Sequence, residues 1–337
     1  MSATGITEKR VATEQEKILT VSVSPHLKDK SSTSTIMRDV LIALCPALIA
    51  SVLIFGVRTL LVTAVCVAFA VAGEWVFEKI VKKPSTIDDL SAVVTGVLLA
   101  YNLPVGIPLW QAAFGSLVAI IVVKQLFGGL GRNFANPAIT ARIIMLLAFS
   151  GTMTAWVIPS VSGALGALSG ASDAVSGATP LVTLKGAEGG GTLPTITNML
   201  LGVRGGCLGE TSAIALLLGG VYLLVRRVIT WHTPVAFVGT VFVFTLLVKG
   251  NLDYSVYQVL SGGLLIGAIF MATDYSTTPN TDWGRIIFGV GCGLITVLIR
   301  VWGNYPEGVS FSILLMNILT PYISKATRKK PLGGVKA

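Results

Sequence analysis

Two short stretches, "TGVLLAYNLP" at residues 95–104 and "SGGLLIGAIF" at residues 261–270, resemble each other although they lie in opposite halves of a chain of 337 residues. Each precedes a longer apolar segment, and these segments, at 113–129 and 287–303, align on a Phe-Gly pair and a later glycine. This similarity predicts an internal repeat built around two interrupted helices. Such helices open their backbone to a ligand or ion in inverted-repeat transporters, although ordinary packing of glycine-rich helix faces remains an alternative.

The composition is that of an integral membrane protein, since 53% of the residues are hydrophobic and only 12% are charged, against about 25% charged in soluble proteins. A helix needs about 20 mostly apolar residues to cross a bilayer. We therefore expect an all-α integral membrane protein with about ten transmembrane helices. They are predicted near residues 37–56, 59–79, 91–103, 108–127, 137–150, 210–225, 233–249, 256–272, 284–301 and 308–324.

The repeat and the charges together predict how the chain is arranged across the membrane. Five spans per half is an odd number, so the two five-helix repeats, 37–150 and 210–324, would have inverted orientations. Most of the 25 Lys and Arg residues fall on the inner side if both termini are cytoplasmic. This predicts a cytoplasmic tail at 1–36, an external loop at 151–209 and a basic cytoplasmic tail at 325–337. Membrane lipid accounts for the net charge of +9, with no need of nucleic acid.

Ionisable residues within the predicted spans should face the bundle interior because exposure of a charge to lipid is costly. Glu74 lies well inside the second span and is a candidate for an ion path. Glu78, Lys124 and Asp274 lie nearer to span ends and are expected at the interface. No metal site is expected, because the four cysteines and two histidines are scattered singly along the chain.

The external loop contains "SDAVSGATPLVTLKG" at residues 172–186, where small residues surround Thr179. A loop of Gly, Ala and Ser has little to pack and is expected to stay mobile. A modifying enzyme could close over such a backbone and phosphorylate or esterify the hydroxyl of Thr179. The alternative is a flexible linker of accidental composition.

Within that stretch, "DAVSGAT" at 173–179 resembles the flavinylation motif of the Rnf and Na⁺-translocating NADH:quinone oxidoreductase complexes. Three further stretches are similar to RnfD subunits: the opening at 19–47, "GRNFANPA" at 131–138 and "MATDYSTTP" at 271–279. The short tail favours RnfD over the related NqrB subunit. Many relatives have Asn-Pro-Phe-Asn-Pro-Ala where this chain has "NFANPA", so the bulky residue has moved while both asparagines keep their spacing.

The resemblance implies an FMN joined through a phosphoester to Thr179, placed there by a flavin transferase that reads the motif residues Asp173, Ser176, Gly177 and Ala178. It also implies an electron-transfer subunit, not catalytic alone, that works with RnfA, RnfB, RnfC, RnfE and RnfG. Such a complex moves electrons from ferredoxin to NAD⁺ and expels Na⁺ or H⁺ across a bacterial or archaeal cell membrane, with the FMN on the external side. A stand-alone transporter or channel and a purely structural anchor are the alternatives.

A second, non-covalent flavin, riboflavin in the related NqrB subunit, is expected near "GRNFANPA". Electrons from an external FMN must cross roughly 30 Å of hydrocarbon, which is too far for one efficient tunnelling step. The amides of Asn133 and Asn136 could donate to and accept from the edge of a flavin ring. The alternative is that both amides only cap the fifth span, with Pro137 in its first turn.

Overall fold

The computed structural model describes residues 32–158, 175–176, 179–186, 193–210, 212–303, 305 and 307–328. Most of the predicted N-terminal tail, much of the predicted external loop and the end of the C-terminal tail lie outside these ranges. Residues from Thr33 onward form one compact unit, and the description below concerns that unit alone.

Helix is found in all ten predicted spans. Five described helices are long and apolar enough to cross a membrane: α2 (Thr33–Phe55), α3 (Arg58–Val81), α12 (His232–Lys249), α15 (Asp282–Trp302) and α16 (Val309–Ala326). The remaining predicted spans contain shorter helices: α4 (Ser91–Tyr101), α5 (Leu109–Leu117) with η2 (Val118–Gln125), α6 (Pro137–Ala148), α11 (Ala213–Val225), and α13 (Leu252–Leu260) with α14 (Leu264–Ile266) and η4 (Gly267–Met271). The prediction of an all-α membrane protein is confirmed, whereas ten crossings in an inverted repeat remain a prediction.

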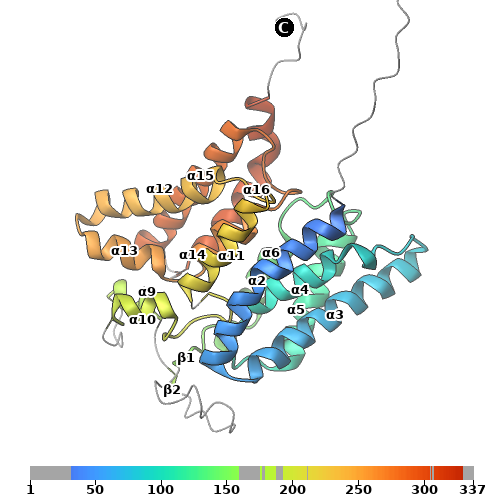
Figure 1. Ribbon diagram of the computed structural model, residues 1–337, viewed down its shortest axis with the longest axis horizontal. Helices are drawn as coiled ribbons and strands as arrows, with labels where there is room; N and C mark the ends of the chain where they lie inside the picture. Colours follow the sequence, from blue (N-terminus) through green and yellow to red (C-terminus); the bar gives the residue numbers. More distant parts are fainter. Residues whose placement is uncertain are drawn as a thin grey trace, which may run out of the picture. The chain divides into compact units, whose positions relative to one another are not determined.

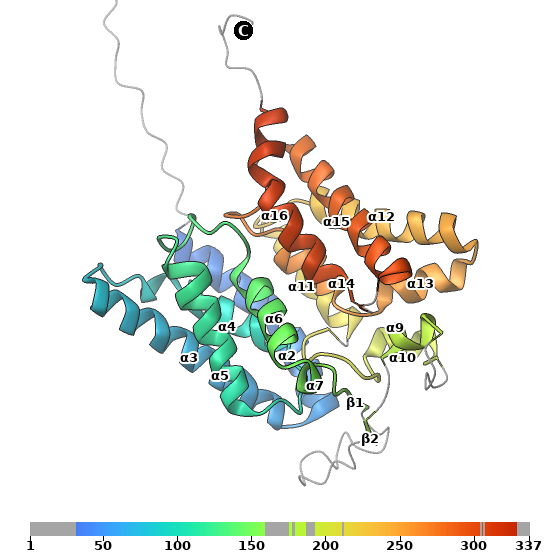
Figure 2. The same ribbon diagram turned by 180° about the vertical axis from the view of Figure 1, so that it is seen from behind.

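The two halves of the chain form two groups of helices that pack side by side. Figures 1 and 2 show α2 to α6 on one side and α12 to α16 on the other. Contacts between the groups join α2 to α11 and α6 to α16, which are elements that the predicted repeat would make equivalent. The buried core is continuous across this junction, where Ala43 and Leu44 of α2 belong to the same hydrophobic cluster as Leu216 and Leu223 of α11.

The third predicted span holds a short helix and the eighth is interrupted, in keeping with the sequence prediction that these two spans are short or broken at glycine. Helix α4 has only 11 residues and starts after Leu90, whose φ of 62° lies in the left-handed region. The eighth span breaks between α13 and α14 with a bend of 64°. Gly262 supplies the break, since its φ of 64° is a conformation that glycine adopts at little steric penalty.

Charged side chains bind the backbone groups that the broken eighth span leaves without helical partners. Arg300 of α15 donates to the carbonyls of Gln258, at 2.5 Å, and of Ser261, at 3.0 Å. The N–H of Gly263 donates to Glu307 Oε1 at 3.3 Å. Because unpaired backbone groups are costly inside a membrane protein, these residues explain how the break is tolerated.

Glu307 also forms an ion pair with Arg142 of α6, and Arg142 Nη1 donates at 3.0 Å to the side-chain oxygen of Asn102, at the end of α4. We call Arg142, Arg300 and Glu307 the charged seam. Through it, the end of α4 and the break in the eighth span are tied together across the junction of the two halves.

The compact unit has two distinct ends. Helix α2 begins and α16 ends at one of them, while α9 (Pro180–Leu184), α10 (Ile196–Leu201) and a small ribbon lie at the other (Figures 1 and 2). The ribbon pairs β1 (Val157–Ile158) with β2 (Val175–Ser176) in antiparallel register. We call these the tail end and the loop end.

Candidate functional site

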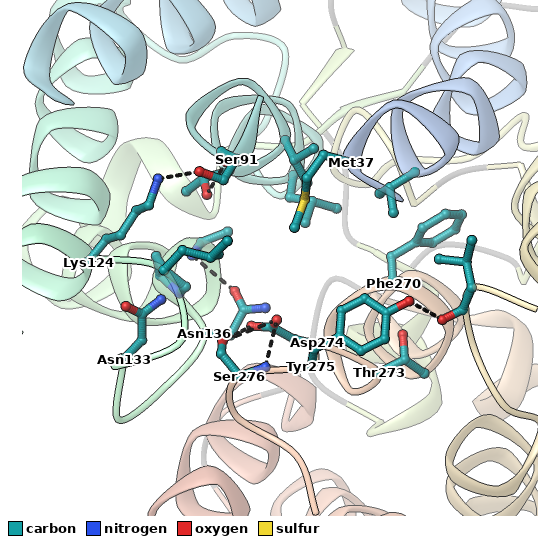
Figure 3. A pocket seen from close by; sticks show the side chains of 18 of the residues that line it. Met37, Ser91, Lys124, Asn133, Asn136, Phe270, Thr273, Asp274, Tyr275 and Ser276 are labelled. Atoms are coloured by element: carbon teal, nitrogen blue, oxygen red, sulfur yellow. Dashed lines mark hydrogen bonds between the residues drawn. The ribbon is translucent and has the colours of Figure 1, made fainter. Parts of the chain in front are cut away.

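A pocket lies between the two halves, lined by residues of α2, α4, η2, the segment 130–138, α11 with the turn at 228–229, η4 and the segment 273–276 (Figure 3). It encloses about 710 Å³, part of which is open to solvent. Its walls include the first turns of α2 and the C-terminal part of α11, which places it towards the tail end.

Both π-helical segments described in the structure contribute side chains to this pocket. Lys124 lies in η2 and Phe270 lies in η4, and both line the cavity. A π-helical turn inserts an extra residue into an α-helix and is frequent at functional sites. The two widened segments come from different halves of the chain, so the pocket is built where both halves depart from regular helix.

Asn136 caps helix α6, as the alternative interpretation of its role required. Its Oδ1 accepts from the N–H groups of Ala138, at 3.1 Å, and Ile139, at 3.3 Å, with Pro137 in the first turn. Its Nδ2 donates to the carbonyl of Met271 at 3.5 Å. Both ends of this amide have protein partners, so the main contribution of Asn136 is to hold α6 against η4.

Asn133 differs from Asn136, because it lines the same pocket but makes no cap. It is 7% exposed, and its Oδ1 is buried without a hydrogen-bond partner. A buried acceptor left unpaired is unfavourable by about 1–3 kcal/mol, so this atom fits a ligand that presents an N–H or O–H group. The neighbouring Phe134 is partly exposed and packs against Phe127 with ring centroids 4.8 Å apart.

The segment 273–276 also lines the pocket and carries a partly buried carboxylate. Asp274 accepts from the backbone N–H of Ser276 at 3.3 Å and from its hydroxyl at 3.2 Å. Burial raises the pKa of Asp274, and the hydrogen bonds from Ser276 offset this only in part. Tyr275 donates from its hydroxyl to the carbonyl of Val228, which fixes its ring at the pocket rim (Figure 3).

Glu74 and Lys124 form an ion pair beside the pocket, with Nζ and Oε1 2.7 Å apart. Lys124 was expected at the interface, but its side chain is 1% exposed and that of Glu74 is fully buried. Lys124 Nζ also donates to Ser91 Oγ at 2.6 Å, and Gln125 donates to Glu74 Oε1 at 2.6 Å. Lys124 and Ser91 reach the cavity, and Glu74 lies one hydrogen bond behind them.

Thr179 lies at the loop end, where it immediately precedes α9. It is 7% exposed, its side chain makes no capping bond to α9, and its carbonyl accepts from the N–H of Val182 at 2.9 Å. Of the motif residues, Ser176 lies in β2, whereas Asp173, Gly177 and Ala178 lie outside the described residues. Lys185 donates to the carbonyls of Gly303 and Tyr305, which holds α9 against the loop that follows α15.

Several residues of the site carried no signal in the sequence. Ser91 and Tyr275 reach the pocket only because α4 and the segment after η4 are brought together by the fold. Arg142, in the fifth predicted span, is 5% exposed and pairs with Glu307 inside the bundle. That pairing joins residues far apart in the chain, and only a rule that every buried charge needs a partner could have suggested it.

The chain is similar to subunits of known oxidoreductase complexes over nearly its whole length. The model of the NQR2, RnfD, RnfE family matches residues 20–333. The subunit named D in the Na(+)-translocating ferredoxin:NAD(+) oxidoreductase complex of Acetobacterium woodii is 47% identical, over 94% of this chain and 96% of the relative. Its counterpart in the proton-translocating ferredoxin:NAD(+) oxidoreductase complex of Clostridium ljungdahlii is 43% identical, over 95% and 97%. The counterpart in the ion-translocating oxidoreductase complex of Stutzerimonas stutzeri is 38% identical, over 90% and 93%.

Proposed function

The chain belongs to the NQR2, RnfD, RnfE family, and on this premise we propose that it is the membrane subunit that relays electrons within an ion-translocating ferredoxin:NAD⁺ oxidoreductase complex. Two flavins would serve the relay: an FMN esterified to Thr179 at the loop end, and a non-covalent flavin, riboflavin by analogy with NqrB, in the pocket near the tail end. Other Rnf subunits are its partners, and the chain by itself is not catalytic.

A flavin suits this task because it exchanges one or two electrons and so links iron–sulfur carriers to a two-electron acceptor. The protein's part is to hold each flavin and to exclude water around it. At the loop end, the small residues before Thr179 and the docking of α9 through Lys185 would position the tethered FMN. Because Thr179 is already buried, we expect the transferase to act before α9 settles against the loop that follows α15.

The observation that carries the pocket proposal is the unpaired Oδ1 of Asn133. Asn133 lines the cavity, and a ring N–H of a flavin that reached its amide oxygen would satisfy that acceptor. The aromatic side chains of Phe270 and Tyr275 also line the cavity and offer surfaces for ring stacking. The pocket and Thr179 lie towards opposite ends of the helical unit, so the two flavins would serve the two ends of the proposed electron path.

The stand-alone transporter has less support. A transporter of this architecture would offer its interrupted helices to a substrate. In this chain, the groups freed at the break of the eighth span bind Arg300 and Glu307. The neighbouring end of α4 binds Arg142.

The proposal is tested by counting flavins on the purified complex. Denatured chain separated on a gel should fluoresce, which reports covalent FMN, and the supernatant should contain one further flavin per chain. A dark band would contradict the covalent relay, and a supernatant with no flavin from this subunit would contradict the pocket proposal. A complex carrying Asn133→Leu should lose the released flavin while the band keeps its fluorescence.

The coupling ion needs a separate measurement, because two similar relatives are named for Na⁺ in one case and for protons in the other. Vesicles containing the whole complex would be supplied with reduced ferredoxin and NAD⁺. Uptake of ²²Na⁺ that persists with a protonophore indicates Na⁺ as the coupling ion, and acidification without ²²Na⁺ uptake indicates protons.

A further inference from the structure

A continuous line of hydrogen bonds joins the pocket to the surface of the protein. Ser91 and Lys124 line the pocket. Lys124 Nζ lies 2.6 Å from Ser91 Oγ and 2.7 Å from Glu74 Oε1. Thr86 Oγ1 lies 3.2 Å from Glu74 Oε1 and 2.5 Å from Oε1 of the buried Glu78, so its hydroxyl can donate to either carboxylate. Thr86 is exposed, in the turn that follows α3, so the line runs from the cavity to solvent through two buried ionisable groups.

Two features set this line apart from an ion pair that only fastens helices together. First, Oε2 of Glu74 is buried and has no hydrogen-bond partner, so the carboxylate retains an acceptor for a further proton or water. Second, Lys124 lies in the π-helical segment η2 and faces the cavity (Figure 3). A pair buried purely for stability gains little over apolar packing and would have no need of one member in a pocket wall.

We propose that Thr86, Glu74 and Lys124 form a proton relay that supplies the pocket from solvent at the turn after α3, with Ser91 holding Lys124 at the cavity. This inference rests on the proposed function, in that the pocket holds a redox group. When that group gains an electron from the complex's redox chain, it gains a negative charge in a poorly solvated site, and proton uptake neutralises that charge.

The transfer balances as follows. The ammonium of Lys124, which lines the pocket, gives a proton to the acceptor there and becomes a neutral amine. Ser91, whose hydroxyl donates to Asp89 Oδ1 at 2.5 Å, accepts from Lys124 and holds it at the cavity. A proton from solvent at Thr86 binds the carboxylate of Glu74 and passes from there to the amine of Lys124. The ion pair is restored, and one proton has entered the pocket for each electron received. No bond other than those to hydrogen is made or broken.

The test uses the purified complex in the Thr179→Ala background, so that flavin signals come from the pocket and not from that tether. Flavin reduction is triggered by a light pulse with a photosensitised donor, and proton uptake is followed with a pH-indicator dye in weak buffer. Glu74→Gln removes the group that relays the proton. Thr86→Val severs the line at the surface and leaves the Glu74–Lys124 pair in place, while Glu78 loses the hydroxyl of Thr86 but keeps its backbone N–H as a donor. Asp39→Asn is the matched control, because this buried carboxylate pairs with Arg226 and lies off the line.

Proton uptake should slow at least tenfold in Glu74→Gln and Thr86→Val, with flavin content unchanged, and should keep its parental rate in Asp39→Asn. Parental uptake rates in Thr86→Val with its flavin retained would overturn the relay, and this variant decides the matter if Glu74→Gln fails to assemble. If the parental complex itself contains no pocket flavin, the failure is that of the proposed pocket, and the relay falls with it.

Discussion

The two proposed flavin sites, one at each end of the helical unit, are encoded in different ways. At the loop end the site is a single hydroxyl, that of Thr179, within a contiguous motif that a modifying enzyme could read on an unfolded chain. The pocket near the tail end takes its walls from seven segments spread over both halves, and no short stretch contains it. A covalent site can therefore be found in sequence, whereas a non-covalent site is created by packing.

The largest effect is expected from Thr179→Ala, which removes the only hydroxyl at the end of the motif. The band should lose all covalent flavin fluorescence, while the chain inserts normally and keeps its releasable flavin. Thr183→Ala is the matched control, because Thr183 is a nearby hydroxyl residue of α9 whose side chain donates to the carbonyl of Thr179 at 3.5 Å. Fluorescence retained in Thr179→Ala would contradict the assignment of Thr179 as the covalent flavin site. Fluorescence lost equally in both variants would show that the loss is not specific to Thr179.

The two ends are expected on opposite sides of the membrane, and cysteine labelling tests this directly. In a Cys45→Ser background, which removes the exposed native thiol, an impermeant thiol reagent applied from outside should label Ala155→Cys near β1. It should spare Ala326→Cys at the end of α16. Both positions are exposed in the structure. The reverse pattern would invert the topology, and equal labelling of both positions would place the two ends on the same side.

The same division, between features encoded in a short stretch and features created by packing, separates what could be predicted from the sequence from what could not. The apolar runs placed a helix in every predicted span, and the glycines of "SGGLLIGAIF" marked the break at Gly262, because hydrophobic length and positive φ are local properties. The roles of Asn133 and Asn136 could not be separated, since capping depends on which backbone N–H groups each amide reaches. The pairing of Lys124 with Glu74 and of Arg142 with Glu307 depends on helix packing between distant segments, to which neither composition nor spacing is sensitive.

A smaller effect is expected when the two pocket asparagines are changed one at a time. Asn133→Leu removes an acceptor that has no protein partner, so it should weaken flavin binding by about 1–3 kcal/mol, or roughly 5- to 150-fold, with little loss of stability. Asn136→Leu removes the cap of α6, so it should lower the free energy of unfolding by about 1 kcal/mol.

Two measurements separate these effects. Titration with added riboflavin gives the flavin affinity of each variant, and a thermal melt gives its stability. Asn133→Leu should show the larger loss of flavin affinity, and Asn136→Leu should show the larger loss of stability. If both change flavin affinity equally, then Asn136 also contacts the ligand and the assignment of Asn133 alone is wrong.

The smallest effect concerns Asp274, whose burial raises its pKa above the ordinary value of 3.8. Between the unfolded and folded pKa values the folded protein holds this proton more tightly, so proton binding stabilises the fold. That stabilisation is present below pH 3.8 and is lost as the pH rises through the folded pKa. The substitution Asp274→Asn avoids this loss, because a carboxamide carries no charge while its oxygen can still accept from Ser276.

The melting temperature of Asp274→Asn should therefore match that of the parent in acid and exceed it increasingly as the pH rises. Once Asp274 is fully ionised, the difference should become constant, because the folded and unfolded parent then bind the same number of protons at this position. Thermal melts of the purified complex over that pH range measure the difference, and covalent fluorescence at Thr179 should be the same in both proteins. A difference that does not vary with pH would show that Asp274 acts through its hydrogen bonds alone.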